Sequence, residues 1–406
     1  MSAGARAHSA LSMRPATRLF LAASAFSSLG NGLTFPVCAL YLVRVRSMPL
    51  AAVSVFYVAM AVAGTVISLA SGRFIDRAGP RTFVAVGVLI EAVGLCAFAA
   101  ADETLLVGAG VLIGAGNGLF FTGLTSLLAA LETGSTLDWV FSLRYMLINA
   151  GNSAGALLGA ALVHGFGERA LTPMYFANAA TSAVLSLVVF MTPVRSGASS
   201  MEPSRVAPAP IRWTRHLAVI VAAHTLLVLF GFALFEAVVP FAFVGEHGNS
   251  VALAHVVVAT STLAIIAGQI PINRWGSVYP KASILRWQAI LWAAAALLGL
   301  AAEGRTGTAL WTLAGSYGLL FGIGECLFAA GLQSLVVRVV KHEQLGRFNG
   351  VLSASYSGAL AVGPALGFAL IECGSIRLFW IAVLAAMIVT SGFWSQLVQR
   401  DDAVPS

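Results

Sequence analysis

Twelve long apolar stretches constrain the fold of this chain more than any other feature of its 406 residues. Each has 18 or more residues and few charges, which is the length that an α-helix needs to cross the hydrocarbon core of a bilayer. A membrane β-barrel would need strands of about ten alternating residues, so helices are expected. The expected spans are 17–43, 51–71, 82–101, 104–131, 139–164, 171–193, 215–243, 251–271, 281–302, 308–337, 347–371 and 376–397.

Basic residues predict how these spans are oriented. If both termini are cytoplasmic, the segments on that side hold 17 of the 23 Lys and Arg residues, and the opposite side holds five. This asymmetry follows the positive-inside rule. We therefore expect a multi-pass protein of the plasma (inner) membrane with both termini in the cytoplasm. The net charge of +7 reflects this topology, and without a basic stripe interleaved with aromatic residues it does not predict nucleic-acid binding.

The first half of the chain is faintly repeated in the second half. The segment Gly114–Leu127 aligns with Gly322–Leu335 at an offset of 208 residues, and eight of the fourteen positions are identical. A duplicated membrane bundle is typical of secondary transporters. At the same offset, the segment 155–159 aligns with 363–367. Both segments carry small residues, and helices are expected to pack closely there. These residues are Gly155, Gly159, Gly363, Pro364 and Gly367.

A polar segment rich in Ser and Pro separates the two copies. The predicted organisation is a cytoplasmic N-terminal segment at 1–16, a six-helix bundle at 17–193, a cytoplasmic linker at 194–214, a second six-helix bundle at 215–397 and a cytoplasmic tail at 398–406. The other loops are short, so sequential helices are expected to be antiparallel neighbours, with no room for a soluble enzymatic domain. The four cysteines lack paired spacing, and we expect neither a cofactor nor a metal site.

The loop between the second and third spans carries a specific motif. It runs Gly72-Arg-Phe-Ile-Asp-Arg-Ala-Gly-Pro-Arg81, and an eroded copy occupies 269–276. With this loop the chain resembles the major facilitator superfamily. The resemblance implies two pseudo-symmetric six-helix bundles that open a central site to each side in turn. It also implies a conformational latch on the cytoplasmic side, formed by Gly72, Asp76, Arg77, Gly79 and Arg81. A plain topogenic loop is the alternative, although Asp has no topogenic use.

Three carboxyl groups, those of Glu91, Glu236 and Glu325, lie inside predicted spans. A charged group at that depth costs about 2.5–3.5 kcal/mol, so each must face water or carry a proton. Glu325 replaces Asn117 of the first copy and is the strongest candidate for proton coupling or substrate contact. A polar contact between helices is the alternative for Glu325 and for Glu91, and snorkelling to the outer interface is the alternative for Glu236. The pair Glu236 and Glu325 is similar to the acidic pair of proton-driven multidrug exporters in the superfamily.

Arg144 is the one basic residue counted with neither side of the membrane, and it is placed inside a predicted span. It is expected to pair with Asp138, Glu132 or a cavity carboxylate, or else to snorkel to the near interface. Its spacing to the asparagines and glycine that follow is similar to a run in superfamily drug exporters. The histidines at 224 and 255 are interpreted as packing residues and are left out of the candidate site. The residues expected to line a cavity are Asn31, Asn117, Phe120, Asn149, Asn152, Phe235 and Tyr356.

These features predict a transporter of the drug:proton antiporter branch, which exports a small amphipathic drug or secondary metabolite in exchange for protons. Its expected partners are that small-molecule substrate, protons and the lipid bilayer, and the chain is expected to be a monomer. Ala156 and Gly110 stand where such exporters often have Pro and Arg, so the direction of transport stays open. The alternatives are a proton-coupled uptake symporter for a sugar or other small metabolite and a transport-inactive sensor on the same scaffold. Enzyme activity is not expected, because no activated nucleophile or phosphate-binding loop is present.

Overall fold

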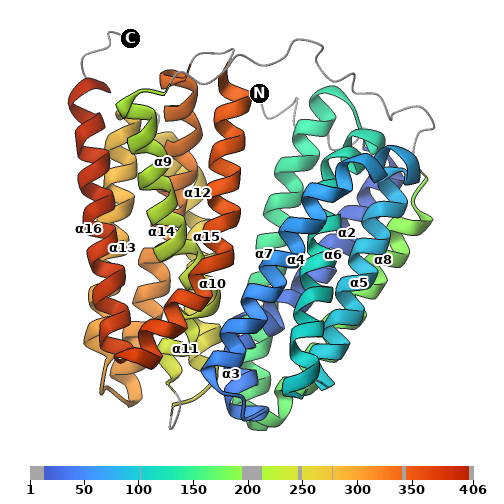
Figure 1. Ribbon diagram of the computed structural model, residues 1–406, viewed down its shortest axis with the longest axis horizontal. Helices are drawn as coiled ribbons and strands as arrows, with labels where there is room; N and C mark the ends of the chain where they lie inside the picture. The colour runs from blue at the N-terminus through green and yellow to red at the C-terminus, as the bar shows by residue number, and fades with distance from the viewer. Residues whose placement is uncertain are drawn as a thin grey trace. The chain divides into compact units, whose positions relative to one another are not determined.

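A computed structural model describes residues 13–100, 102–193, 213–245, 249–276, 278–340 and 344–401. Across these ranges the chain is helical and forms no strand (Figure 1). Eleven helical ranges are long and apolar enough to cross a membrane. The expected all-helical membrane fold is therefore confirmed, whereas the number of such ranges is eleven and not twelve. The difference arises because one range, Met146–Met191, contains the end of α7 (Gly134–Phe166) and all of α8 (Leu171–Met191).

The chain divides into two compact units, one formed by Met1–Phe35 with Val45–Arg205 and the other by Pro36–Arg44 with Val206–Ser406. In the first unit, the 3₁₀ turn η3 (Gly167–Ala170) connects α7 to α8. Its other helices are α2 (Pro15–Thr34), α4 (Leu50–Ala78), α5 (Pro80–Ala100) and α6 (Glu103–Leu131).

Polar groups fix the ends of several helices in the first unit. Asp102 begins α6 by accepting hydrogen bonds from the backbone N–H groups of Thr104 and Leu105, which is the usual role of an N-cap residue. The buried carboxylate of Glu132 accepts from the Arg14 N–H at 2.9 Å and from the Thr17 hydroxyl at 2.6 Å. It therefore holds the start of α2 against the end of α6, where a negative charge also complements the helix dipole of α2.

The second unit contains α12 (Ala252–Gly276), α13 (Lys281–Ala302), α14 (Gly307–Val339), α15 (Leu345–Cys373) and α16 (Ile376–Asp401). Its first span is interrupted, because α9 (Arg215–Leu227) continues through the π-helical turn η4 (Val228–Phe232) into the short helices α10 (Ala233–Ala237) and α11 (Val239–Val244). The segment after α2 is interrupted in a similar way and consists of η1 (Phe35–Val37), α3 (Cys38–Leu40) and the π-helical turn η2 (Tyr41–Val45).

The same pattern of helix pairs recurs in both units. In the first unit, α6 packs against α4 and α5, and α8 packs against α5 and α2. In the second unit, α14 packs against α12 and α13, and α16 packs against α13 and α9. The aligned segments Gly114–Leu127 and Gly322–Leu335 lie in α6 and α14, so the faint sequence repeat corresponds to helices with equivalent packing partners.

Glycines allow the closest of these helix contacts. A Cβ atom on Gly114 of α6 would collide with the backbone carbonyl of Met60 in α4. A Cβ atom on Gly155 of α7 would collide with the carbonyl of Leu29 in α2. In the second unit, a Cβ atom on Gly363 or Gly367 would collide with side chains of the α10 segment and its flanks. Gly159 and Pro364 are buried. Small residues at such crossings let helix backbones approach in a membrane, where packing drives association.

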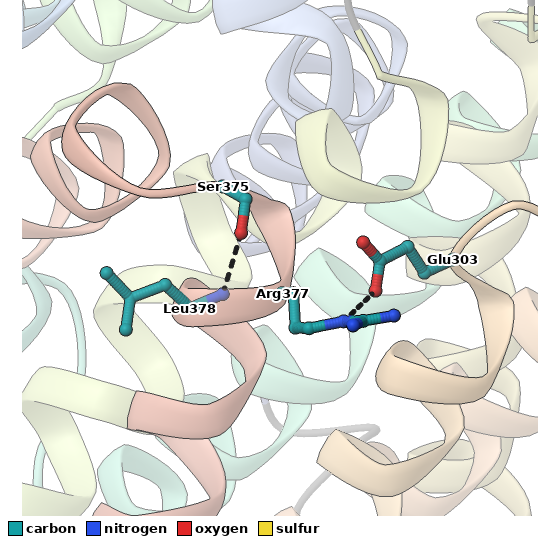
Figure 2. Close-up of polar contacts among 4 residues, drawn as sticks. All are labelled: Glu303, Ser375, Arg377 and Leu378. Carbon is teal, nitrogen blue, oxygen red and sulfur yellow. Dashed lines mark hydrogen bonds and ion pairs between the residues drawn. The ribbon is translucent and has the colours of Figure 1, made fainter.

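Large apolar side chains also cover much of the surface. Leu69 of α4 is 82% exposed and Phe166 at the end of α7 is 69% exposed. Such surfaces suit contact with lipid chains rather than water. Some polar contacts lie at helix ends, as Figure 2 shows for Arg377 at the start of α16, which donates to Glu303 after α13 at 2.8 Å. Both side chains of this pair are solvent-accessible, so it adds little stability.

Candidate functional site

Glu325 lies within α14 and is partly buried. The residues on either side of it pack tightly: Gly324 lies against the indole of Trp292, and the Cys326 thiol lies 3.8 Å from the carbonyl oxygen of Ile265. No hydrogen bond or ion pair joins the Glu325 carboxylate to another residue that the structure describes. Its packed neighbours thus hold the backbone in place while the acid group itself has no protein partner in this part of the chain.

Of the other two predicted acids, the structure describes the side chain of Glu91 and only the backbone of Glu236. Glu91 lies in α5 and is partly buried, and Gly116 of α6 packs directly on its backbone. Within the described parts of the chain, its carboxylate makes no hydrogen bond or ion pair. Glu236 occupies the fourth position of α10, just after η4, but its side chain lies outside the described residues.

Arg144 of α7 packs on an aromatic ring, with its Cζ atom 5.6 Å from the centroid of Phe120 in α6. Its Nε atom is buried and has no hydrogen-bond partner among the residues that the structure describes. The expected partner Glu132 instead binds the start of α2. The side chain of Asp138 lies outside the described residues, and its spacing of six residues puts it on a different face of the helix. The observed partner of Arg144 is therefore an aromatic face, as in a cation–π contact.

The expected cavity-lining asparagines are partly buried, and they lie in α2, α6 and α7. The Oδ1 atom of Asn152 is enclosed without a hydrogen bond, and the Asn152 backbone lies against Gly32. The other three asparagines of the expected cavity are Asn31, Asn117 and Asn149, and each is partly buried.

The sequence analysis missed a fully buried polar cluster between α2 and α8. The Asn178 Nδ2 atom donates to the Thr34 hydroxyl at 2.8 Å, and the Tyr175 hydroxyl donates to the Thr34 carbonyl at 3.1 Å. The available signal was the spacing of Tyr175, Asn178, Thr181 and Ser182, which places four polar groups at helical intervals in an otherwise apolar span. The cluster makes a specific contact between these two helices.

Aromatic rings form a connected column in the second unit. The Phe235 ring stacks on Phe321 with centroids 3.8 Å apart, and Phe321 stacks on Trp292 at 4.3 Å. Phe232 contacts Trp292 at 5.0 Å and Phe328 at 5.2 Å. Tyr356 of α15 extends the column, 6.2 Å from Phe232.

His224 of α9 also belongs to this aromatic column, although it was left out of the predicted site. Its ring lies 6.1 Å from the Phe328 ring and 6.4 Å from the Tyr356 ring. Its Nδ1 atom lies 2.9 Å from the Ser355 hydroxyl. A polar group in such apolar surroundings was visible in the sequence, but its aromatic neighbours come from helices more than 100 residues away.

The motif between the second and third spans lies at the junction of α4 and α5. Gly72, Asp76 and Arg77 fall in the last turns of α4, and their side chains lie outside the described residues. Gly79 has a φ of 77° and separates the two helices, a conformation that glycine adopts without a steric penalty. Arg81, near the start of α5, packs its Cζ atom 5.7 Å from the centroid of Phe190.

The long apolar helices and their exposed apolar side chains indicate an integral membrane protein. The sequence profile of the Major Facilitator Superfamily matches residues 20–242 and 221–405. The chain belongs to this superfamily, and it is a membrane transporter of that type rather than an enzyme. The superfamily membership expected from the loop motif is confirmed; the drug:proton antiporter branch stays a prediction.

Individual relatives are more distant. The chain is 30% identical over 157 residues to the uncharacterized MFS-type transporter YdeE of Escherichia coli (strain K12), a match that spans 38% of this chain and 39% of that protein. A bacterial homologue of the iron transporter ferroportin has a TM-score of 0.77 at 15% identity, over 95% of this chain and 99% of that one. The nucleoside transporter NupG has a TM-score of 0.74 at 12% identity, over 95% and 99%. At such identities the two structures support the fold alone.

Proposed function

We propose that this protein is a proton-driven exporter of a small amphipathic organic compound, a drug or a secondary metabolite. The observation that carries the proposal is the Glu325 carboxylate, which lies within an apolar helix without a hydrogen bond or ion pair among the described residues. A charge at such a position costs about 2.5–3.5 kcal/mol, and protonation removes that cost. A group that is stable when protonated and charged only when water reaches it is suited to carrying protons.

The aromatic column supports an amphipathic organic substrate. Phe328 follows Glu325 by three residues on α14, and Phe321 precedes it by four residues. The Phe235 ring stacks on Phe321, and Phe232 connects Phe328 to Tyr356. The flat apolar faces of such rings favour a substrate with an aromatic or extended apolar body over a small inorganic ion. Arg144, Glu91 and Glu236 are proposed as further coupling or substrate groups, with the four asparagines at 31, 117, 149 and 152 as neutral polar contacts.

The proposed topology has twelve spans in two six-helix bundles, at 17–193 and 215–397. The protein lies in the plasma membrane, and both termini and the 194–214 linker are on the cytoplasmic side. A single span needs about 20 residues, so the 46 residues of Met146–Met191 supply two crossings with η3 between them. The motif from Gly72 to Arg81 is proposed to hold the cytoplasmic side closed during part of the cycle, with Asp76 as its acidic member.

An efflux panel tests this function. Cells that lack their own drug pumps are loaded with fluorescent dyes and drugs, and efflux is compared for wild type, Glu325→Gln and the matched control Glu372→Gln, whose side chain is exposed at the end of α15. We expect wild type and the control to export and Glu325→Gln to match empty cells, with export abolished by an uncoupler.

Other results would redirect the proposal. Uncoupler-sensitive accumulation of a labelled sugar or metabolite would identify an uptake symporter instead. Transport that is unchanged by both Glu325→Gln and Asp76→Ala would contradict the coupling mechanism and favour a sensor.

A further inference from the structure

His224 is held in one protonation pattern by its neighbours. Its Nδ1 atom lies 2.9 Å from the Ser355 hydroxyl oxygen, and that same oxygen lies 2.9 Å from the carbonyl of Leu352. A hydroxyl has one hydrogen to donate. Both contacts are hydrogen bonds only when Ser355 donates to Leu352 and His224 donates its Nδ1–H to Ser355. A neutral imidazole in this arrangement presents Nε2 as a hydrogen-bond acceptor.

The Nε2 atom of His224 is available to a ligand. No residue in the described ranges forms a hydrogen bond with it. The atom is also not completely enclosed by the protein. The residue as a whole is 3% exposed. A small exposed area at Nε2 in an otherwise buried ring is what a binding group needs, because a ligand atom can reach it while bulk water is largely excluded.

Two aromatic rings lie beside the His224 ring, and a third contacts both of them. The Phe328 ring of α14 lies nearly parallel to the imidazole, at 24°, and the Tyr356 ring of α15 is inclined at 36°. Phe232, the last residue of the π-helical turn η4, contacts both of these rings. The faces of aromatic rings attract cations. Glu325 lies three residues before Phe328 on α14, at a neighbouring position of the helix surface, and contributes a negative charge there in the part of the cycle in which it has released its proton.

We infer that His224 Nε2 accepts a hydrogen bond from an N–H group of an organic cation whose flat apolar body packs on Phe232, Phe328 and Tyr356. This inference rests on the proposed function and names a substrate class for it: aromatic amines in their protonated form. The π-helical turn contributes by placing Phe232 beside the other two rings, and such turns occur frequently at functional sites. Ser355 acts as a positioning residue that fixes the tautomer of His224.

A pair of fluorescent cations tests the inference on the purified full-length protein in detergent. 9-Aminoacridine is protonated at neutral pH and offers N–H donors, whereas 10-methylacridinium has the same ring system and charge without an N–H donor. Binding of each is followed by fluorescence anisotropy. We expect wild type to bind 9-aminoacridine about tenfold more tightly than 10-methylacridinium, the effect of one hydrogen bond to a charged group.

Variants of His224 identify the acceptor. In His224→Asn the amide nitrogen can still donate to Ser355, but nothing replaces Nε2, so the preference for 9-aminoacridine is expected to vanish. In His224→Gln the amide oxygen reaches the Nε2 position, so part of the preference is expected to remain. His164→Asn, at an exposed position near the end of α7, is the matched control and should keep the full preference. Size-exclusion profiles establish that each variant is folded.

Three outcomes would overturn the inference: no binding of either acridine, equal binding of the two by wild type, or an unchanged preference in folded His224→Asn. These outcomes are separable from failure of the proposed function. Uncoupler-sensitive export that depends on Glu325, together with equal affinity for the two acridines, would retain the exporter and remove only the role of His224.

Discussion

At the scale of single residues, the charged side chains of Arg144 and Glu132 contact different helices. Both charges lie in or beside apolar segments, so the sequence allows them to pair with each other. Instead Glu132 binds the Arg14 N–H, 118 positions away in the sequence, while Arg144 lies on the Phe120 ring. Which groups meet depends on how helices cross, and hydropathy patterns carry no information about rotation or crossing angle. The same limit left His224 out of the predicted site.

Glu132 offers a first prediction at this scale. The residue is 7% exposed, and its carboxylate accepts two hydrogen bonds at the start of α2. We expect Glu132→Ala to destabilise the protein by about 1.5–3 kcal/mol, because a buried N–H and a buried hydroxyl lose a charged acceptor. Thermal unfolding in detergent measures the change. Glu372→Ala removes an exposed carboxylate and should change stability by less than about 0.5 kcal/mol; equal effects of the two variants would contradict the capping role.

Asp102 gives a prediction with a pH dependence. It lies outside the membrane spans, and its pKa is lowered from 3.8, first by the hydrogen bond from the Thr104 hydroxyl and then by that from the Leu105 N–H. A lowered pKa in the folded state means that the cap stabilises α6 above pH 3.8 and weakens as the pH falls through the lowered value. The protection factors for hydrogen exchange in the first turn of α6, which are corrected for the intrinsic pH dependence of exchange, should therefore fall at acid pH. Asp102→Asn, which caps without a titrating group, should lack this fall, and protection factors equally pH-sensitive in both proteins would exclude Asp102 as the cause.

At the scale of elements, apolar length predicted most helices closely. The expected spans 104–131 and 281–302 correspond to α6 (Glu103–Leu131) and α13 (Lys281–Ala302). The interruptions were not predicted. Span 17–43 ends its regular helix at Thr34, before Pro36, and span 215–243 contains the π-helical turn η4. Proline marks the first break, since it lacks an N–H group. The second depends on tertiary packing, because Gly231 in η4 lies against the Trp292 ring.

Two glycines of α6 test whether helix crossings set the packing. A Cβ atom on Gly114 would meet the Met60 carbonyl of α4, whereas a Cβ atom on Gly108 would meet no atom within 4 Å. Gly114→Ala should destabilise the unit by about 1–3 kcal/mol through overpacking. Gly108→Ala should be neutral or stabilise α6 by up to about 1 kcal/mol, the difference in helix propensity. Thermal unfolding of the two variants is the measurement, and a destabilised Gly108→Ala beside an unaffected Gly114→Ala would reject this account of the α4–α6 contact.

At the scale of the whole molecule, the internal repeat predicted more than the individual motifs did. Equivalent helix pairs pack in both units, α4 with α6 and α12 with α14, although few residues are shared between the copies. The pattern of small residues and apolar faces is what duplication preserves, since it is sufficient to reproduce the same crossings. The groups proposed to contact protons or substrate need not repeat: the position of Asn117 in α6 holds Glu325 in α14. The fold could therefore be predicted from the repeat, whereas the chemistry of the site required the actual arrangement of side chains in each unit.

The turn η3 determines whether the chain crosses the membrane once or twice between Met146 and Met191. That number decides on which side of the membrane every later loop lies. If η3 (Gly167–Ala170) lies at the outer surface between two crossings, a reporter fused after Glu168 is outside and one fused after Ser199 is inside. Alkaline phosphatase, which is active only outside, should be active at 168 and inactive at 199 and after Ser406. Green fluorescent protein fused at the same three positions should show the reverse, because its chromophore matures in the cytoplasm. If Met146–Met191 crossed only once, positions 168 and 199 would report the same side or a buried site, the C-terminus would lie outside, and the cytoplasmic position proposed for the linker would be wrong.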